Sequence, residues 1–117
     1  MDEQDVLLRE RDDLSVFHHN EWDLYVEYSA ENRFQLGKGE RWHVYLNDYP
    51  FGVFASVIRM PGSYGYEFGL YEMAFCTEKD GILPIFNKAW GGSVLGYLDE
   101  EQVIHWIDVL MESMGLD

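Results

Sequence analysis

Cysteine is nearly absent from this sequence, since Cys76 is the only one among 117 residues. A single cysteine excludes an intramolecular disulfide framework and a four-cysteine metal cage. The sequence also has no run of about eighteen apolar residues, which is the length that a membrane-spanning helix needs. Its first thirteen residues, MDEQDVLLRERDD, have neither the basic nor the apolar region of a secretory signal. We therefore expect a cytoplasmic protein that is not inserted in a membrane.

Positive charge is scarce as well. The chain has 8 lysines and arginines against 22 acids, which gives a formal net charge of −14. Such a charge repels the phosphates of nucleic acids and the anionic surfaces of membranes. It attracts basic protein surfaces, including the basic grooves in which other proteins hold nucleic acid. The charge argues against direct nucleic-acid or membrane binding and for a basic protein partner, with solubility alone as the alternative explanation.

Length and composition predict one folded domain over residues 1–117. Hydrophobic residues make up 47% of the chain, which is far from the composition of a disordered protein. Residues 1–20 are expected to form an acidic N-terminal arm or a short helix. Within them, residues 2–13 hold six acids and two arginines around a few leucines and Val6, a pattern typical of a short amphipathic helix or a charged arm. We favour one or two helical turns.

Alternating or continuous apolar residues predict a sheet of about five strands, mostly antiparallel. The run FGVFASVIRM is β-branched and almost wholly apolar, which predicts a central strand buried on both faces. Asp80–Gly81 is a hairpin signal, and Pro84 in the following segment predicts an edge strand or an extended connection. The predicted extended segments are residues 22–28, 41–46, 51–60, 70–76, 82–86 and 93–98.

The C-terminal segment predicts an amphipathic helix. Asp99 is an N-cap residue, and Gln102 lies at the capping-box position three residues later. Apolar side chains then recur at helical spacing, and Gly115 is placed to end the helix. The expected stripe is Val103, Ile107, Leu110 and Met114, with Ile104 and Met111 beside it. The fold class is therefore α+β, with this helix packed on one face of the sheet.

The stretch MPGSYGYEFGLYEM, residues 60–73, is either a ligand-cradling loop or a connection between two strands. Its glycines lack the spacing of a phosphate-binding loop, and Glu67 would repel a phosphate. Pro61–Gly62 suits a tight turn, and Gly65 and Gly69 suit positive φ, so we predict a strand connection. Such a surface loop also offers aromatic anchors to a protein partner, at Tyr64, Tyr66 and Phe68.

Histidines and candidate nucleophiles give a weaker signal for chemistry. His19-Asn20-Glu21 matches the H-x-E half of a zinc deaminase motif, but the P-C-x-x-C half is absent. His43 could serve as a base for Ser56, Cys76 or Ser93, although no nucleophile elbow surrounds any of them. We predict no metal, no cofactor and no catalysis, and keep a small hydrolase or metal-dependent enzyme as an alternative.

Acids are concentrated at the start of the chain, where the first 31 residues contain ten of them against Arg9 and Arg11. A row of carboxylates on a rigid body can imitate the spacing of phosphates, and interleaved aromatic residues can anchor a partner. We predict that these acids and the aromatic loop together bind a basic protein surface. The predicted partner-binding residues are Asp2, Glu3, Asp5, Glu10, Asp12, Asp13, Glu21, Trp22, Asp23, Glu27, Glu31, Tyr64, Tyr66 and Glu67.

The segment SYGYEFGLYEMAF, followed by a turn and by VLGYLDEEQVIHWI, resembles a pattern of small acidic proteins from bacteriophages and mobile elements. The resemblance spans residues 50–112 and carries no catalytic residues. It implies a bacterial host cell and an inhibitor of host defence, a group that includes anti-CRISPR proteins occupying the DNA-binding surface of a Cas effector. The leading hypothesis is therefore a non-enzymatic inhibitor of this kind. An immunity or antitoxin-like protein that neutralises a basic toxin is the other binding hypothesis.

Overall fold

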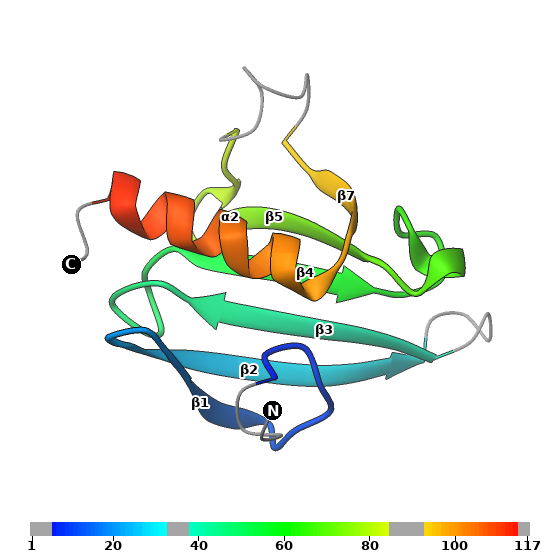
Figure 1. The fold of residues 1–117 in the computed structure, drawn as a ribbon, viewed down its shortest axis with the longest axis horizontal. Helices are drawn as coiled ribbons and strands as arrows, with labels where there is room; N and C mark the ends of the chain where they lie inside the picture. The colour runs from blue at the N-terminus through cyan, green and yellow to red at the C-terminus, as the bar shows by residue number, and fades with distance from the viewer. Residues whose placement is uncertain (1–5, 33–37, 85–92, 115–117) are drawn as a thin grey trace.

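A computed structural model describes residues 6–32, 38–84 and 93–114, which form one antiparallel sheet and one long helix (Figure 1). Within these residues, no helix is long and apolar enough to cross a membrane. The α+β class and the C-terminal helix are confirmed. The elements are β1 (Leu14–His19), β2 (Trp22–Asn32), β3 (Lys38–Tyr45), β4 (Phe54–Arg59), the 3-10 turn η2 (Tyr66–Phe68), β5 (Tyr71–Thr77), β6 (Gly81–Ile82), β7 (Leu95–Leu98) and α2 (Glu100–Ser113).

The sheet runs in the order β1-β2-β3-β4-β5-β6, and β7 pairs with β5 as well. In the part of the chain that the structure describes, the sheet therefore has seven strands, whereas about five were predicted. One reason is β1, whose segment LSVFHH was assigned to the N-terminal arm or helix. Its last residue, His19, pairs with Trp22 across a two-residue turn, and Asn20 takes the positive φ of 54° that this turn needs. Asparagine tolerates this conformation better than most residues, so a hairpin forms there.

The predicted N-terminal helix is wrong for the described residues before β1, which form an irregular segment. Leu7 and Leu8 are both buried, although they are neighbours in the chain. The polar backbone of the segment is bonded to distant groups, because the Leu8 amide donates to Glu100 Oε1 at 2.8 Å and the Trp42 indole donates to the Arg9 carbonyl at 2.9 Å. These tertiary contacts satisfy groups that a helix would otherwise bond internally.

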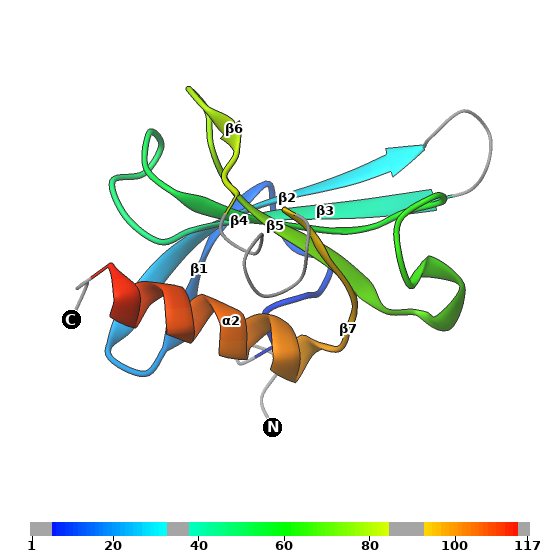
Figure 2. The same ribbon diagram turned by 90° about the horizontal axis from the view of Figure 1, so that it is seen from above.

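Helix α2 covers one face of the sheet, and the core lies between them (Figure 2). The predicted capping box is present, because the Asp99 side chain accepts from the Gln102 amide and the Gln102 side chain accepts from the Asp99 amide. The fully buried line of the helix is Val103, Ile107 and Met111, at a spacing of four residues. Leu110 and Met114, predicted in the central stripe, pack against the edge of the core instead.

The predicted central strand over residues 51–60 is wrong in length and in burial. The strand begins only at Phe54, because the amides of Phe51 and Gly52 both donate to the Asp48 carbonyl in a tight turn. Phe51 is 78% exposed at the end of this turn. In β4, buried and half-buried residues alternate, as on a strand with one core face. The strand with both faces largely buried is β5, from Met73 to Cys76.

Candidate functional site

The face of the sheet opposite α2, here called the outer face, carries the most unusual group of side chains. In the described residues no helix lies over it (Figure 2). Strand register places Glu27, His43 and Ser56 in one row across β2, β3 and β4. Since side chains alternate along a strand, Tyr25 and Tyr45 lie on the same face as this row. Acidic, aromatic and polar groups therefore meet on an open sheet surface.

Five rings form a continuous aromatic cluster on the outer face. Tyr25 stacks on Tyr49 with ring centroids 4.8 Å apart, and Tyr49 meets Tyr45 edge-on at 4.8 Å. Tyr45 packs against Phe54 at 5.1 Å, and Phe54 against His43 at 4.4 Å. These separations are typical of favourable ring pairs. The cluster, defined as Tyr25, His43, Tyr45, Tyr49 and Phe54, joins β2, β3, β4 and the β3–β4 connection.

Glu27 is the acceptor at the centre of this cluster. The Tyr45 hydroxyl donates to Glu27 Oε1 at 2.8 Å, and the Tyr49 hydroxyl donates to Glu27 Oε2 at 3.4 Å. Burial raises the pKa of Tyr45, and the bond to Glu27 and its charge raise it further. The pKa of Tyr49 is raised for the same reasons, with burial first. Both phenols therefore remain neutral donors, and the carboxylate is held at a defined position.

A hollow, here called the outer hollow, opens beside Glu27. Its floor consists of sheet residues, and its rim includes Pro50 from the β3–β4 connection and Glu78 from the β5–β6 turn. Both connections rise from the sheet on the side away from α2 (Figure 2). The outer hollow is lined by Glu27, His43, Tyr45, Pro50, Phe54 and Glu78. A neighbouring hollow shares Glu27 and His43 with it and extends toward Asp13 and Arg41.

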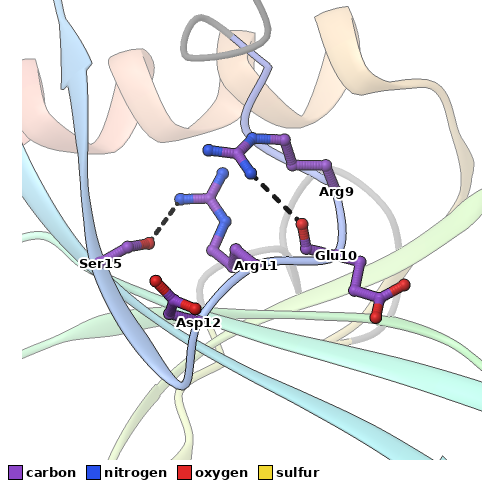
Figure 3. Close-up of a pocket in the computed structure, with 5 residues that line it drawn as sticks. All are labelled: Arg9, Glu10, Arg11, Asp12 and Ser15. Atoms are coloured by element: carbon purple, nitrogen blue, oxygen red, sulfur yellow. Dashed lines mark hydrogen bonds between the residues drawn. The ribbon is translucent and has the colours of Figure 1, made fainter.

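The acids before β1 are carried by a segment that Arg11 fastens to the fold (Figure 3). Arg11 Nη2 donates to the carbonyls of Val6 and Leu7 at 2.9 and 2.6 Å, and its Nη1 donates to Ser15 Oγ at 2.9 Å. Burial lowers the pKa of Arg11, and the nearby charge of Arg9 lowers it further. The Glu10 carboxylate points away from both guanidinium groups in Figure 3.

The predicted partner-binding acids are not gathered on one surface. Glu10, Asp12 and Asp13 are exposed at the β1 edge, and of these Asp13 adjoins the outer face. Glu21 and Asp23 are exposed at the β1–β2 hairpin. Asp2, Glu3 and Asp5 lie outside the described residues, as does the side chain of Glu31.

The aromatic residues among the predicted partner-binding residues also lie far apart. Trp22 is half-buried and packs against the core, which leaves little of its ring for a partner. Tyr64, Tyr66 and Glu67 lie in the β4–β5 connection, at the opposite end of the sheet from the β1–β2 hairpin (Figure 1). A partner that contacts Tyr64 and Asp23 together would have to span the length of the sheet.

The glycine-rich stretch is the predicted strand connection, because β4 precedes it and β5 follows it. Gly62, Gly65 and Gly69 all have positive φ, as expected. The connection exposes Tyr64 and Phe68, whose rings lie 6.4 and 6.3 Å from the ring of Tyr97 in β7. Sequence reasoning missed Tyr97, because only the pairing of β7 with β5 brings it to this tip.

His19, the histidine of the H-x-E sequence, lies in β1 next to a second histidine, His18. His18 and His19 are neighbours in β1, so their side chains point to opposite faces of the sheet. His18 contacts the exposed Asp23, and His19 Nε2 lies 2.7 Å from Asp108 Oδ1 of α2. In the described ranges, no group of three or more His, Cys, Asp or Glu side chains could hold a metal ion.

The candidate nucleophiles differ in their surroundings. His43 faces Ser56 across β3 and β4. Cys76 is buried, and burial raises the pKa of its thiol, so little of the reactive thiolate is present at neutral pH. The Glu27 carboxylate, which lies opposite His43 in the sheet, already accepts hydrogen bonds from two tyrosine hydroxyls.

Comparisons with known proteins found no match: no family model, no curated protein and no solved structure is similar to the chain.

Proposed function

We propose that the protein is a non-enzymatic inhibitor that binds the basic surface of a nucleic-acid-handling protein. Its most concrete form is an anti-CRISPR protein that blocks DNA binding by a Cas effector. The outer face carries this proposal, because it combines the fixed carboxylate of Glu27 and nearby exposed acids with half-exposed aromatic rings on an open sheet. Binding anchors in protein interfaces are often aromatic, and complementary charge speeds the encounter.

The charge of the whole chain supports a basic partner. A net charge of −14 on 117 residues creates a negative potential around the molecule. Asp23 is exposed on the outer face, Asp13 is exposed beside it at the β1 edge, and Glu27 is held by two tyrosine hydroxyls. Carboxylates at fixed positions lose little conformational entropy when a partner binds, which favours the complex.

Competition with DNA is the mechanism that these features favour. A basic groove releases counterions when it binds the phosphate backbone, and a rigid acidic protein can occupy the same groove. Inhibition should therefore weaken as salt is raised, since screening reduces the attraction between exposed charges. The aromatic cluster would add contacts that salt does not screen.

The test measures displacement of labelled duplex DNA from purified guide-loaded Cas effectors by fluorescence anisotropy, at low and moderate salt. The panel also contains a basic nuclease toxin and an unrelated DNA-binding protein. We expect displacement from at least one Cas effector, with weaker inhibition at the higher salt. Binding to the toxin alone would favour the antitoxin-like function, and displacement from no member of the panel would contradict the proposal.

A matched pair of variants tests where the charge acts. Asp13→Asn with Asp23→Asn removes two charges from the outer face and its β1 edge, whereas Glu101→Gln with Glu112→Gln removes two exposed charges from α2. We expect the first pair to weaken inhibition about twofold to tenfold, as for exposed charge pairs, and the second to change it little. Equal effects of both pairs would mean that net charge alone, and no particular surface, matters.

A further inference from the structure

We propose that the outer hollow is a binding site for an arginine side chain of the partner protein. The inference rests on the proposed function, because it names the group of the basic partner that this surface receives. Two features of the hollow point to a planar cation. Its floor is aromatic, and carboxylates stand on two sides of it.

The aromatic floor is preformed. Phe54 lies between Tyr45 and His43, with ring centroids 5.1 and 4.4 Å away. Tyr45 is 8% exposed and bonded to Glu27, so its ring cannot turn freely. A cation above such rings gains electrostatic attraction from their faces, and a guanidinium also stacks on them as a flat group.

The carboxylates supply the charge. Glu27 Oε1 and Oε2 each accept one tyrosine hydroxyl, and a carboxylate oxygen has a second lone pair for another donor. Glu78 is exposed on the rim, and it makes no hydrogen bond or ion pair with the part of the chain that the structure describes. Its charge contributes to the raised pKa of Tyr45, which places it within electrostatic reach of the floor.

Arginine fits this arrangement better than lysine. Five donors in one plane can reach Glu27 and Glu78 on different sides while the plane lies against an aromatic ring. An ammonium group is a strongly hydrated point charge and must lose more of its water to enter. The walls from the β3–β4 connection and the β5–β6 turn leave the hollow open outward, so a side chain on another protein can enter.

The test is an NMR titration of the full-length protein with N-acetyl-arginine-N-methylamide, followed through backbone amide and aromatic signals. The neutral isostere N-acetyl-citrulline-N-methylamide and the corresponding lysine derivative are the matched probes. We expect saturable shifts at Tyr45, Phe54 and Glu78 with the arginine probe, smaller shifts with lysine and none with citrulline. Shifts spread over all exposed acids, equal shifts with lysine, or no shifts would overturn the arginine site.

Variants locate the binding. Glu78→Gln removes the rim charge, and Phe54→Leu removes the ring but keeps an apolar side chain. Each should weaken the arginine probe about threefold to tenfold, in line with exposed ion pairs and cation–π contacts, whereas Glu101→Gln on α2 should have no effect. Unchanged affinity in both hollow variants would contradict the inference.

The two proposals fail separately. DNA displacement without arginine binding would contradict the arginine site but not the inhibitor function. Arginine binding without displacement of DNA from any nucleic-acid-binding protein would contradict the proposed function but not the arginine site.

Discussion

The Tyr45 hydroxyl donates a hydrogen bond of 2.8 Å to Glu27 on the sheet face opposite α2. Tyr49 donates to the other oxygen of the same carboxylate, so Glu27 of β2 is bonded to β3 and to the β3–β4 connection at once. The bond to Tyr45 links the stability of the fold to the shape of the candidate binding surface.

The first prediction concerns this bond. Tyr45→Phe should lower the free energy of unfolding by about 1 to 2 kcal/mol, because it removes a hydrogen bond to a charged acceptor next to a nearly buried ring. Urea unfolding measures the change. Tyr97→Phe is the control, since Tyr97 is 53% exposed and should change stability by less than about 0.5 kcal/mol. Equal changes in the two variants would contradict the structural role of the bond.

The second prediction concerns alkaline pH. Burial raises the pKa of Tyr28 to about 12, and its hydrogen bond of 2.9 Å to Glu40 contributes as well. A group with a raised pKa in the folded state stabilises the fold fully below its unfolded pKa, here near 10.0. The free energy of unfolding should therefore fall as pH rises from about 10 through about 12.

Urea unfolding across this pH range, together with tyrosinate absorbance, checks the alkaline prediction. Tyr28→Phe should flatten the decline, because it removes the proton that the folded state retains. A slope in the variant as steep as that of the parent protein would show that other groups cause the alkaline loss.

The third prediction concerns the segment before β1. Arg11→Ala should destabilise the protein by about 1 to 3 kcal/mol, because the carbonyls of Val6 and Leu7 and the Ser15 hydroxyl lose a charged donor. Arg9→Ala is the control, since within the described residues the Arg9 side chain donates one long hydrogen bond of 3.3 Å. Hydrogen exchange at the Leu8 amide should rise in the Arg11 variant. Unchanged exchange would mean that Arg11 is not needed to hold the segment in place.

The fourth prediction concerns the glycine-rich connection. Gly65→Ala should cost more stability than Gly62→Ala, although both glycines have φ above 90°. A Cβ at Gly65 would lie 3.0 Å from the Leu70 Cβ and 3.1 Å from the Tyr97 Cα, whereas nothing lies within 4 Å at Gly62. Gly62→Ala should cost about 1 kcal/mol from strained φ alone. Equal melting temperatures for the two variants would contradict the close approach of Tyr97.

Local signals in the sequence predicted the parts of the fold that depend on neighbouring residues. The spacing of Asp99 and Gln102 predicted the capping box of α2, because its bonds join residues three apart. The alternation over residues 22–28 likewise predicted an extended segment, and in β2 Leu24, Val26 and Tyr28 are buried while Trp22 is half-buried.

Contacts between distant residues explain what the sequence did not predict. The segment before β1 is irregular because its partners include Glu100, which lies 92 residues from Leu8. The aromatic cluster joins Tyr25, Tyr49 and Phe54 from three parts of the chain, and only strand register and the turn after β3 bring them together. Of the predicted partner-binding residues, Glu27 alone lies at the centre of that cluster.

Hydrogen–deuterium exchange of the protein in complex with the Cas effector whose DNA it displaces tests whether the outer face is the binding surface. We expect slower exchange in the β3–β4 connection and the β5–β6 turn, around Pro50 and Glu78, and unchanged exchange in α2. Protection confined to α2 or to the β4–β5 connection around Tyr64, or the absence of a complex with any effector, would contradict the outer face as the binding surface.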